Sequence, residues 1–196
     1  FQQVIADLGV SGRAEDRARF ERHLGSVLRD LGRKTEDAAI FRSAAQAFGE
    51  AATTRAGTKG GLVTGLDRKL QGECLSEYAR LSGDATGYRE AAAVFGALAE
   101  FEDGESNVFG LAEAKHQQGV ALANYAERSG DIGTMKEAGA AFAEAAESHR
   151  HTGRERERAR ALHNRGATLL HWANHTKLAE DFRASAESSS IAAEIY

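Results

Sequence analysis

The chain has 196 residues, a formal net charge of −4 and a single cysteine, Cys74. A negative net charge argues against a general nucleic-acid binder, and one cysteine excludes an internal disulfide framework. No apolar run reaches the length of a membrane span. We therefore expect a cytoplasmic protein without membrane association. Because the chain begins with Phe1 rather than Met, we also expect it to be part of a longer protein.

The composition favours helices throughout. The chain contains no proline, is rich in Ala, Glu, Arg and Leu, and shows no strand-length alternation of β-branched residues. The sequence therefore predicts an all-α fold. In chain order, we expect helices over residues 13–32, 36–53, 61–82, 86–101, 107–129, 133–150, 155–175 and 177–195.

A repeated phrase organises these helices. Residues 71–84 read QGECLSEYARLSGD, and residues 118–131, 47 positions later (118 − 71), read QGVALANYAERSGD. The same step aligns further residues: Gly25, Gly72, Gly119 and Gly166; Leu28, Leu75, Leu122 and Leu169; Phe48, Phe95 and Phe142. This predicts four helix-pair units, at about 13–53, 60–101, 107–150 and 154–196. We expect the last to be shortened, because the alignment is lost after Trp172.

Glycines mark two features of each unit. Gly83 and Gly130 are typical of the left-handed position after a helix, where Asp84 and Asp131 would cap the next helix. Thr134 with Glu137 offers an alternative helix start in the third unit. The aligned glycines inside the first helices predict close approach of the paired helix, and the small residues expected to face them are Ala44, Ala91 and Ala138.

The pattern Gly119-x2-Leu122 followed by Ala138-x3-Phe142-x2-Ala145 resembles the tetratricopeptide repeat, and the resemblance covers nearly the whole chain. It implies a right-handed superhelix of helix-turn-helix units, of a divergent bacterial kind. The unit is longer than the family's usual one, and the usual proline is absent. Another α-solenoid remains an alternative, since the spacing also suits HEAT-like pairs.

The resemblance also implies where a ligand binds, because first helices line the concave wall in that family. Residues three before each repeat glycine would lie on this wall, together with two neighbouring positions: Arg22, Lys69, His116, His163, Arg29 and Asn124. Basic groups pair with carboxylates, so this ladder predicts an acidic peptide or C-terminal carboxylate as ligand. The alternative is a solvated charged face.

Charge is also separated along the chain. Residues 99–147 are acidic, whereas SHRHTGRERERARALHNR, which begins at Ser148, is rich in arginine. This arrangement is consistent with self-association or a charged partner, or with a solvated surface. No aromatic residues are interleaved with the arginines, which argues against nucleic acid.

No pattern in the sequence supports catalysis. His171 and His175 are one helical turn apart, as zinc ligands can be, but Trp172 occupies the position of the metalloprotease glutamate. The glycine-rich GTKGGLVTG, residues 57–65, lacks the order of a phosphate-binding loop and is interpreted as a loop. We expect no enzyme activity, no cofactor and no metal.

We therefore expect a scaffold module that binds a protein or peptide in a groove. The alternative is a structural spacer or a homo-oligomerisation module, in which the last helix, with Ile191, Ile195 and Tyr196, packs against another copy.

Overall fold

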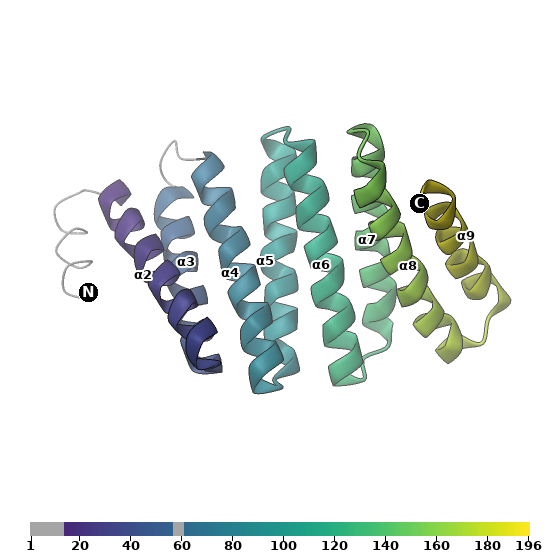
Figure 1. The fold of residues 1–196 in the computed structure, drawn as a ribbon, viewed down its shortest axis with the longest axis horizontal. Helices are drawn as coiled ribbons and strands as arrows, with labels where there is room; N and C mark the ends of the chain where they lie inside the picture. Colours follow the sequence, from purple (N-terminus) through teal and green to yellow (C-terminus); the bar gives the residue numbers. More distant parts are fainter. Residues whose placement is uncertain (1–13, 57–60) are drawn as a thin grey trace. The chain divides into compact units, whose positions relative to one another are not determined.

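The computed structural model describes residues 14–56 and 61–196, and within these ranges all regular structure is helical (Figure 1). The helices are α2 (Ala14–Thr35), α3 (Ala38–Ala56), α4 (Gly61–Ser82), α5 (Ala85–Gly104), α6 (Val108–Ser129), α7 (Gly133–His151), α8 (Glu155–Thr176) and α9 (Ala179–Ile195). The predicted all-α fold and all eight predicted helices are confirmed, with boundaries that shift by no more than a few residues. No helix in the described part is long and apolar enough to cross a membrane.

The first helices of successive helix-pair repeats follow one another at a constant interval. α2, α4, α6 and α8 begin at residues 14, 61, 108 and 155, three steps of 47, and each is 22 residues long. The expected loss of the 47-residue alignment in the fourth helix-pair repeat is wrong. Gly166 in α8 faces Ser189 in α9, as Gly119 faces Phe142, and 189 − 142 is again 47. Serine in place of phenylalanine hides this match in the sequence.

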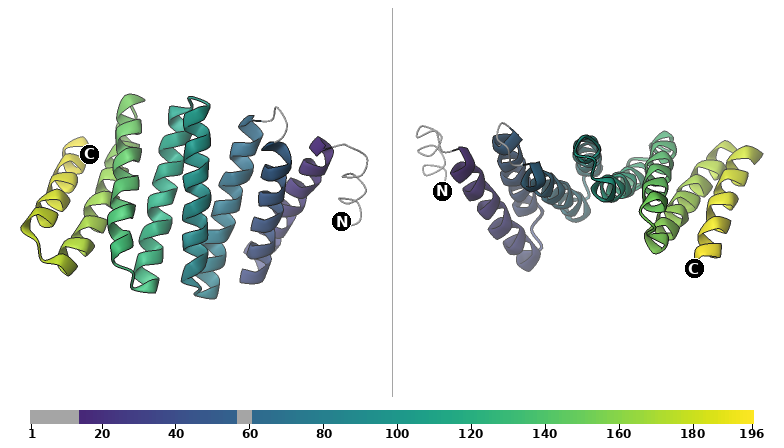
Figure 2. Two further views of the ribbon diagram at one scale, coloured as in Figure 1. Left: turned by 180° about the vertical axis from the view of Figure 1, so that it is seen from behind. Right: turned by 90° about the horizontal axis from the view of Figure 1, so that it is seen from above.

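The chain also divides into two compact parts, each larger than one 47-residue repeat: residues 1–94 and residues 95–196. From here on, these two parts are called the first unit and the second unit. In the first unit, α3 packs against both α2 and α4. In the second unit, α7 packs against α6 and α8, and α8 also packs against α9. Seen from behind, α3 and α7 each lie in front of the helices with which they pair (Figure 2). Each unit therefore has two helical layers.

The core combines small and aromatic side chains. In α3 the residues Phe41, Ala44, Phe48 and Ala51 are at most 2% exposed. Alternating spacings of three and four residues place these side chains on one helix face, which α3 turns toward α2. A Cβ added at Gly25 would stand 3.0 Å from the ring of Phe48. Close approach is thus confirmed at Gly25, Gly119 and Gly166, but the facing residue is a phenylalanine or, at Gly166, a serine, and not the predicted alanine.

The helix ends confirm part of the predicted capping. Gly83 and Gly130 have φ angles of 76° and 75°. Asp84 caps α5, because its Oδ1 accepts a hydrogen bond of 2.9 Å from the amide of Thr86. The predicted cap at Asp131 is wrong, since Ile132 occupies the N-cap of α7.

The structure also bears on the alternative helix start at Thr134 and on the glycine-rich loop. The alternative start at Thr134 is wrong, because that residue lies inside α7 and its hydroxyl donates to Asp131. The predicted glycine-rich loop lies partly outside the described residues, at 57–60, and from Gly61 onward it is helical.

Candidate binding surface

A buried carboxylate joins α2, α3 and α4. Asp67, in α4, is fully buried. Its Oδ1 accepts a hydrogen bond of 2.5 Å from Nε of Arg22 in α2, and its Oδ2 accepts one from Nη1 of Arg55 in α3. Burial raises the pKa of the Asp67 carboxyl, while the guanidinium groups of Arg22 and Arg55 act in the opposite direction. Because both arginines donate to it, this carboxylate is a hydrogen-bonded junction between helices.

A second buried carboxylate lies on α2. Glu21 is fully buried, and it accepts hydrogen bonds of 2.7 Å from Nε of Arg17 and 3.0 Å from the hydroxyl of Thr54 in α3. Buried charges are rare in proteins unless they are paired and hydrogen-bonded, and these carboxylates satisfy that condition. The resulting network fixes the packing of α2 and α4 around α3.

This network determines the surroundings of Arg22, the first member of the predicted ladder. Arg22 is 25% exposed, and besides Asp67 its Nη2 binds the carbonyl of Val63 at 2.9 Å. It lies at a hollow of about 440 Å³ together with Arg19 and Arg55. Its guanidinium group is already hydrogen-bonded to Asp67 and Val63, so Arg22 offers less to an acidic ligand than the sequence suggests.

The other predicted residues of the first unit do not join that hollow. Lys69 and Arg29 are half-buried, and neither lines it. The nearest carboxylate oxygen to Arg29 is Oδ1 of Asp30, at 4.0 Å from its Nε. The first unit therefore does not bring Arg22, Lys69 and Arg29 together at one cavity.

In the second unit the ladder is divided between core and surface. His116 is only 4% exposed and packs edge-on against Phe142, with ring centroids 5.4 Å apart. Burial lowers its pKa to about 4, so the imidazole is neutral at physiological pH. His163 is exposed, and Asn124 is half-buried. His116 therefore cannot present a cation to a ligand.

His149 in α7 is a second buried histidine nearby. It is fully buried, and neither ring nitrogen has a hydrogen-bond partner among the residues that the structure describes. Its closest carboxylate oxygen is Oε1 of Glu113, 3.9 Å from Nε2, and that oxygen is 3.8 Å from Arg160. Burial lowers the pKa of His149 as well. Two neutral imidazoles thus lie in the core of the second unit.

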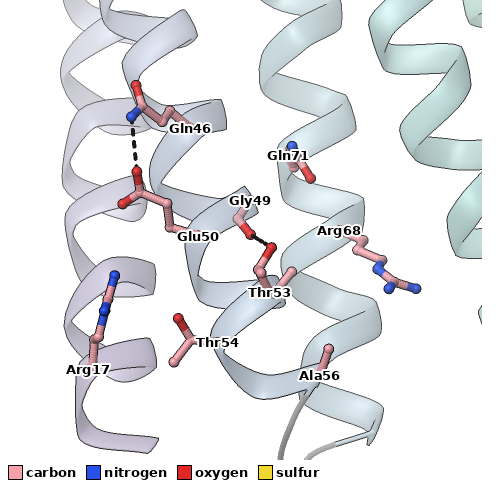
Figure 3. A pocket seen from close by; sticks show the side chains of 10 residues that line it. Arg17, Gln46, Gly49, Glu50, Thr53, Thr54, Ala56, Arg68 and Gln71 are labelled. Carbon is pink, nitrogen blue, oxygen red and sulfur yellow. Dashed lines mark hydrogen bonds between the residues drawn. The ribbon is translucent and has the colours of Figure 1, made fainter. Parts of the chain in front are cut away.

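The first unit also carries two adjoining hollows along α3. One, of about 580 Å³, lies between Arg17 of α2 and Arg68 of α4 and is bounded by Gln46, Gly49, Glu50, Ala52, Thr53, Thr54, Ala56 and Gln71 (Figure 3). The other, of about 470 Å³, is lined by Arg42, Ala45, Gln46, Gln71, Leu75, Glu90, Ala93 and Val94. Because both are lined by Gln46 and Gln71, we treat them as one surface and call it the α3 groove.

Small residues shape the α3 groove, and polar ones line it. A Cβ at Gly49 would stand 2.6 Å from Nε2 of Gln71, so the glycine makes room for that amide. Gln46 donates a hydrogen bond of 2.9 Å to Glu50. Arg42 forms a salt bridge of 2.7 Å with Glu90 and lies over the ring of Tyr78. The groove thus offers amide, guanidinium and carboxylate groups beside small apolar ones.

The amide contact recurs in the second unit, where Nε2 of Gln118 lies 2.9 Å from the Cβ position of Gly96. Sequence reasoning missed these glutamines as binding candidates. The signal was present, since Gln71 and Gln118 open the two copies of the repeated phrase.

The arginine-rich stretch after Ser148 is largely paired within its own helices. Arg150 binds Glu147 at 2.5 Å, and Arg158 binds Glu155 at 3.0 Å. Arg154 lies over the ring of Phe109, 4.1 Å from its centroid. The ion pairs balance part of the positive charge that the sequence separates from the preceding acidic residues.

Ile191 and Ile195 are half-buried, and packing of the last helix against another copy stays a prediction. Both side chains pack inward, against the cluster of Ala145, Ala146, Ala161, Leu162 and Ala192. Tyr196, in contrast, is 80% exposed. The last helix therefore uses its isoleucines to complete the core of its own unit.

Within residues 14–56 and 61–196, no group of three or more His, Cys, Asp or Glu side chains is placed to hold a metal ion. The ring of His175 contacts Trp172, with centroids 6.5 Å apart. Cys74 is buried, and burial raises the pKa of its thiol to about 12, which disfavours the nucleophilic thiolate. The thiol of Cys74 is therefore a poor nucleophile in the folded protein.

Comparison with known proteins supports the fold. No model of a protein family matches the chain, and no curated protein sequence does. Among solved structures, the chain is similar to one titled DHF58 filament, with 16% identity over 93% of each chain and a TM-score of 0.56. It is also similar to the de novo designed helical repeat protein DHR64, with 14% identity over 94% of this chain and 95% of that one, and a TM-score of 0.50.

A third similar structure is a circular tandem repeat protein with a novel repeat topology. It shares 17% identity over 98% of this chain and 50% of its own length, with a TM-score of 0.51. At these identities the likeness concerns the fold alone. The chain is a helical repeat array, of the general α-solenoid class.

Proposed function

We propose that the protein is a non-catalytic binding module that holds a peptide segment of another protein in the α3 groove. The observation that carries this proposal is that two hollows, of about 580 and 470 Å³, share Gln46 and Gln71 and follow one helix. A long open groove suits an extended chain better than a compact small molecule, which is usually enclosed.

The dimensions of the groove agree with such a ligand. Its lining residues on α3 run from Arg42 to Ala56. At 1.5 Å per residue, 14 steps of helix span about 21 Å, which is the length of roughly six extended residues. A peptide of this length would contact Gln46 and Gln71 near its middle.

The lining also fits the chemistry of a polypeptide. A glutamine amide both donates and accepts hydrogen bonds, so it can pair with the N–H and C=O groups of a peptide backbone. Charged side chains flank the glutamines, with Arg17 on one side and Arg42 with Glu90 on the other. We infer a ligand of mixed charge. The acidic ligand of the predicted ladder remains a separate proposal, for which Lys69 and His163 are the better candidates.

The wider setting is also proposed. The spacing of Gly119, Leu122, Ala138 and Phe142 supports a tetratricopeptide-like identity for the repeat. We propose that this array is a scaffold segment of a cytoplasmic bacterial protein that acts without cofactor or nucleic acid.

A random-peptide display selection against the whole chain tests the groove. Thr53 lines the groove and Ser43 does not, yet both are exposed on α3 and donate their hydroxyl to the carbonyl four residues earlier. Thr53→Trp should therefore obstruct the groove, and Ser43→Trp is its matched control. We expect enriched peptides to lose binding to Thr53→Trp alone, in protein whose helicity is unchanged. Peptides that bind both variants equally, or no enrichment, would refute the proposal.

A further inference from the structure

The two arginines that donate to Asp67 have histidines as their equivalents in the second unit. His116 lies 94 residues after Arg22 (116 − 22), and His149 lies 94 residues after Arg55 (149 − 55). Since 94 is two steps of 47, each histidine occupies the position of an arginine in an equivalent helix. The positions that carry permanent charge in the first unit therefore hold titratable groups in the second.

The carboxylate between the arginines has no counterpart at the equivalent position. Two repeats after Asp67 comes Ala161, which is fully buried. His149 is fully buried as well, and a buried charge must be paired. When the ring of His149 is protonated, both of its nitrogens are donors, so its charge must be met by a carboxylate from another position.

Glu113 of α6 supplies the nearest carboxylate, and it lies between two possible partners. Its Oε1 is 3.9 Å from Nε2 of His149 and 3.8 Å from Nη2 of Arg160 in α8. Both distances are longer than a hydrogen bond, and a displacement of about 1 Å toward either donor would form one. The side chains of Glu113 and Arg160 are 25% and 51% exposed, so both have room to move.

The other charged groups of α6 and α8 near His149 act in both directions. Burial is the main reason that the pKa of His149 is lowered; Glu113 and Glu157 oppose the shift, whereas Arg160 and Arg154 add to it. His116 of α6 is the second titratable ring, and its pKa is lowered by burial, Arg160 and His149.

The remaining neighbours of His149 are paired or uncharged. On α7 itself, Glu147 binds both Arg150 and His151. α9 meets the second-unit core through uncharged side chains, those of Ile191, Ala192 and Ile195. Glu113 is therefore the carboxylate placed to respond when His149 gains a proton.

We propose that Glu113 is a protonation-dependent selector between α7 and α8. While His149 is neutral, the carboxylate pairs with Arg160; when His149 is protonated, the carboxylate moves to its Nε2–H and leaves Arg160. The released guanidinium is exposed on α8, one turn before the exposed His163. Acidification would thus change the charge of this face of α8, a regulatory step that is independent of the α3 groove.

NMR titration of the histidine rings in the whole chain tests the first step. His149→Leu identifies the signals of His149, and its pKa in the folded protein is then measured in wild type, Glu113→Gln and Arg160→Gln. Removing the carboxylate should lower this pKa by about 1 unit, and removing the guanidinium should raise it, because an opposite charge favours the protonated ring and a like charge disfavours it. Glu147→Gln, at an exposed position on α7, is the matched control. A shift in Glu113→Gln no larger than in the control would overturn the proposal.

The release of Arg160 is tested on its guanidinium group. Solvent exchange of the Nε–H proton, measured by ¹⁵N NMR relative to that of Arg158, should accelerate with the same midpoint as the titration of His149. Arg158 is the reference because its salt bridge lies within α8. His149→Leu should remove the step, whereas His116→Leu should retain it. Exchange at Arg160 that does not change with the titration of His149, or a step that persists in His149→Leu, would overturn the proposal.

Discussion

The ring of Phe142 lies against the backbone of Gly119, because a Cβ on that glycine would stand 2.9 Å from the ring. Real Cβ atoms do not approach a ring carbon so closely, so the two helices pack at a distance that only glycine permits. The same relationship joins Gly25 and Phe48.

Gly119→Ala should therefore destabilise the second unit. Alanine gains about 1 kcal/mol of helix propensity, but overpacking costs about 1–3 kcal/mol, and a ring enclosed by helices has little space to move. Urea unfolding followed by the fluorescence of Trp172, the chain's single tryptophan, reports on this unit. Gly104→Ala is the control, since no atom lies within 4 Å of its Cβ position. Equal stability of the two variants would contradict the packing argument.

Asp67→Asn should destabilise the first unit strongly. The change removes the carboxylate that balances Arg55, which is 2% exposed, and breaking a buried ion pair typically costs about 3–5 kcal/mol. Glu77→Gln is the control, because its partner Arg80 is exposed and such surface pairs contribute about 1 kcal/mol or less. Hydrogen exchange of α3 and α4 measures the difference. A loss no larger than in the control would show that the network is not stabilising.

The thiol of Cys74 should be inert in the folded protein. It is 1% exposed, and its raised pKa of about 12 leaves almost no thiolate at neutral pH. Alkylation by iodoacetamide should then follow opening of the first unit and accelerate in urea. Labelling of the native chain at the rate of the denatured chain would contradict the burial.

Acid should destabilise the second unit. His116 has a pKa of about 4 in the folded protein and an ordinary value of 6.5, so the unfolded chain binds the proton first. Its contribution is complete above about pH 6.5 and is lost as pH falls toward 4, and the full effect is on the order of 3 kcal/mol. His149 adds in the same direction, opposed by Glu113 and Glu157 and assisted by Arg160.

Trp172 fluorescence in urea at pH 7 and pH 5 measures this loss, and Cys74 alkylation reports on the first unit for comparison. His116→Leu should be less sensitive to pH than the wild type. A wild type whose second unit is equally stable at both pH values would refute the prediction.

The acidic-ligand ladder needs a variant that leaves the fold intact. Arg22→Glu would place a second carboxylate beside that of Asp67 and should unfold the first unit. Lys69→Glu changes a half-buried side chain outside that network and should preserve stability. Fluorescence anisotropy with a labelled polyglutamate peptide should show weaker binding to Lys69→Glu than to wild type if the ladder binds acids. Unchanged affinity would refute the hypothesis.

The repeat architecture was predictable from the sequence because the same helix-packing constraint recurs along the chain. Residues such as Gly25 and Gly119 recur at a constant step, so each copy supports the assignment of the others. The match of Ser189 to Phe142 was not predictable, because the substitution removes the residue type on which the alignment relies. The identity of the glycine's neighbour was also beyond reach, since period alone does not determine how two helices are rotated against each other.

The buried ion-pair network beside the site was less predictable, because its contacts do not repeat. In the next repeat, the positions equivalent to Asp67 and Arg55 hold Ala114 and Glu102. The ion pair therefore leaves no repeated pattern in the sequence. Ladder position alone gave His116 the same role as Lys69, although the structure buries the histidine. Pairing and burial, which decide whether a basic side chain is accessible, arise from three-dimensional packing.

The constant interval between first helices has a genetic consequence. A duplication or deletion of one 47-residue block within the array would rejoin the chain at an equivalent position, in the same helix and on the same face. Such an event would change the number of units without creating a new type of junction, since stability in repeat arrays depends mainly on neighbouring units. Changes in array length by whole units should therefore be tolerated far better than insertions of a few residues inside a helix.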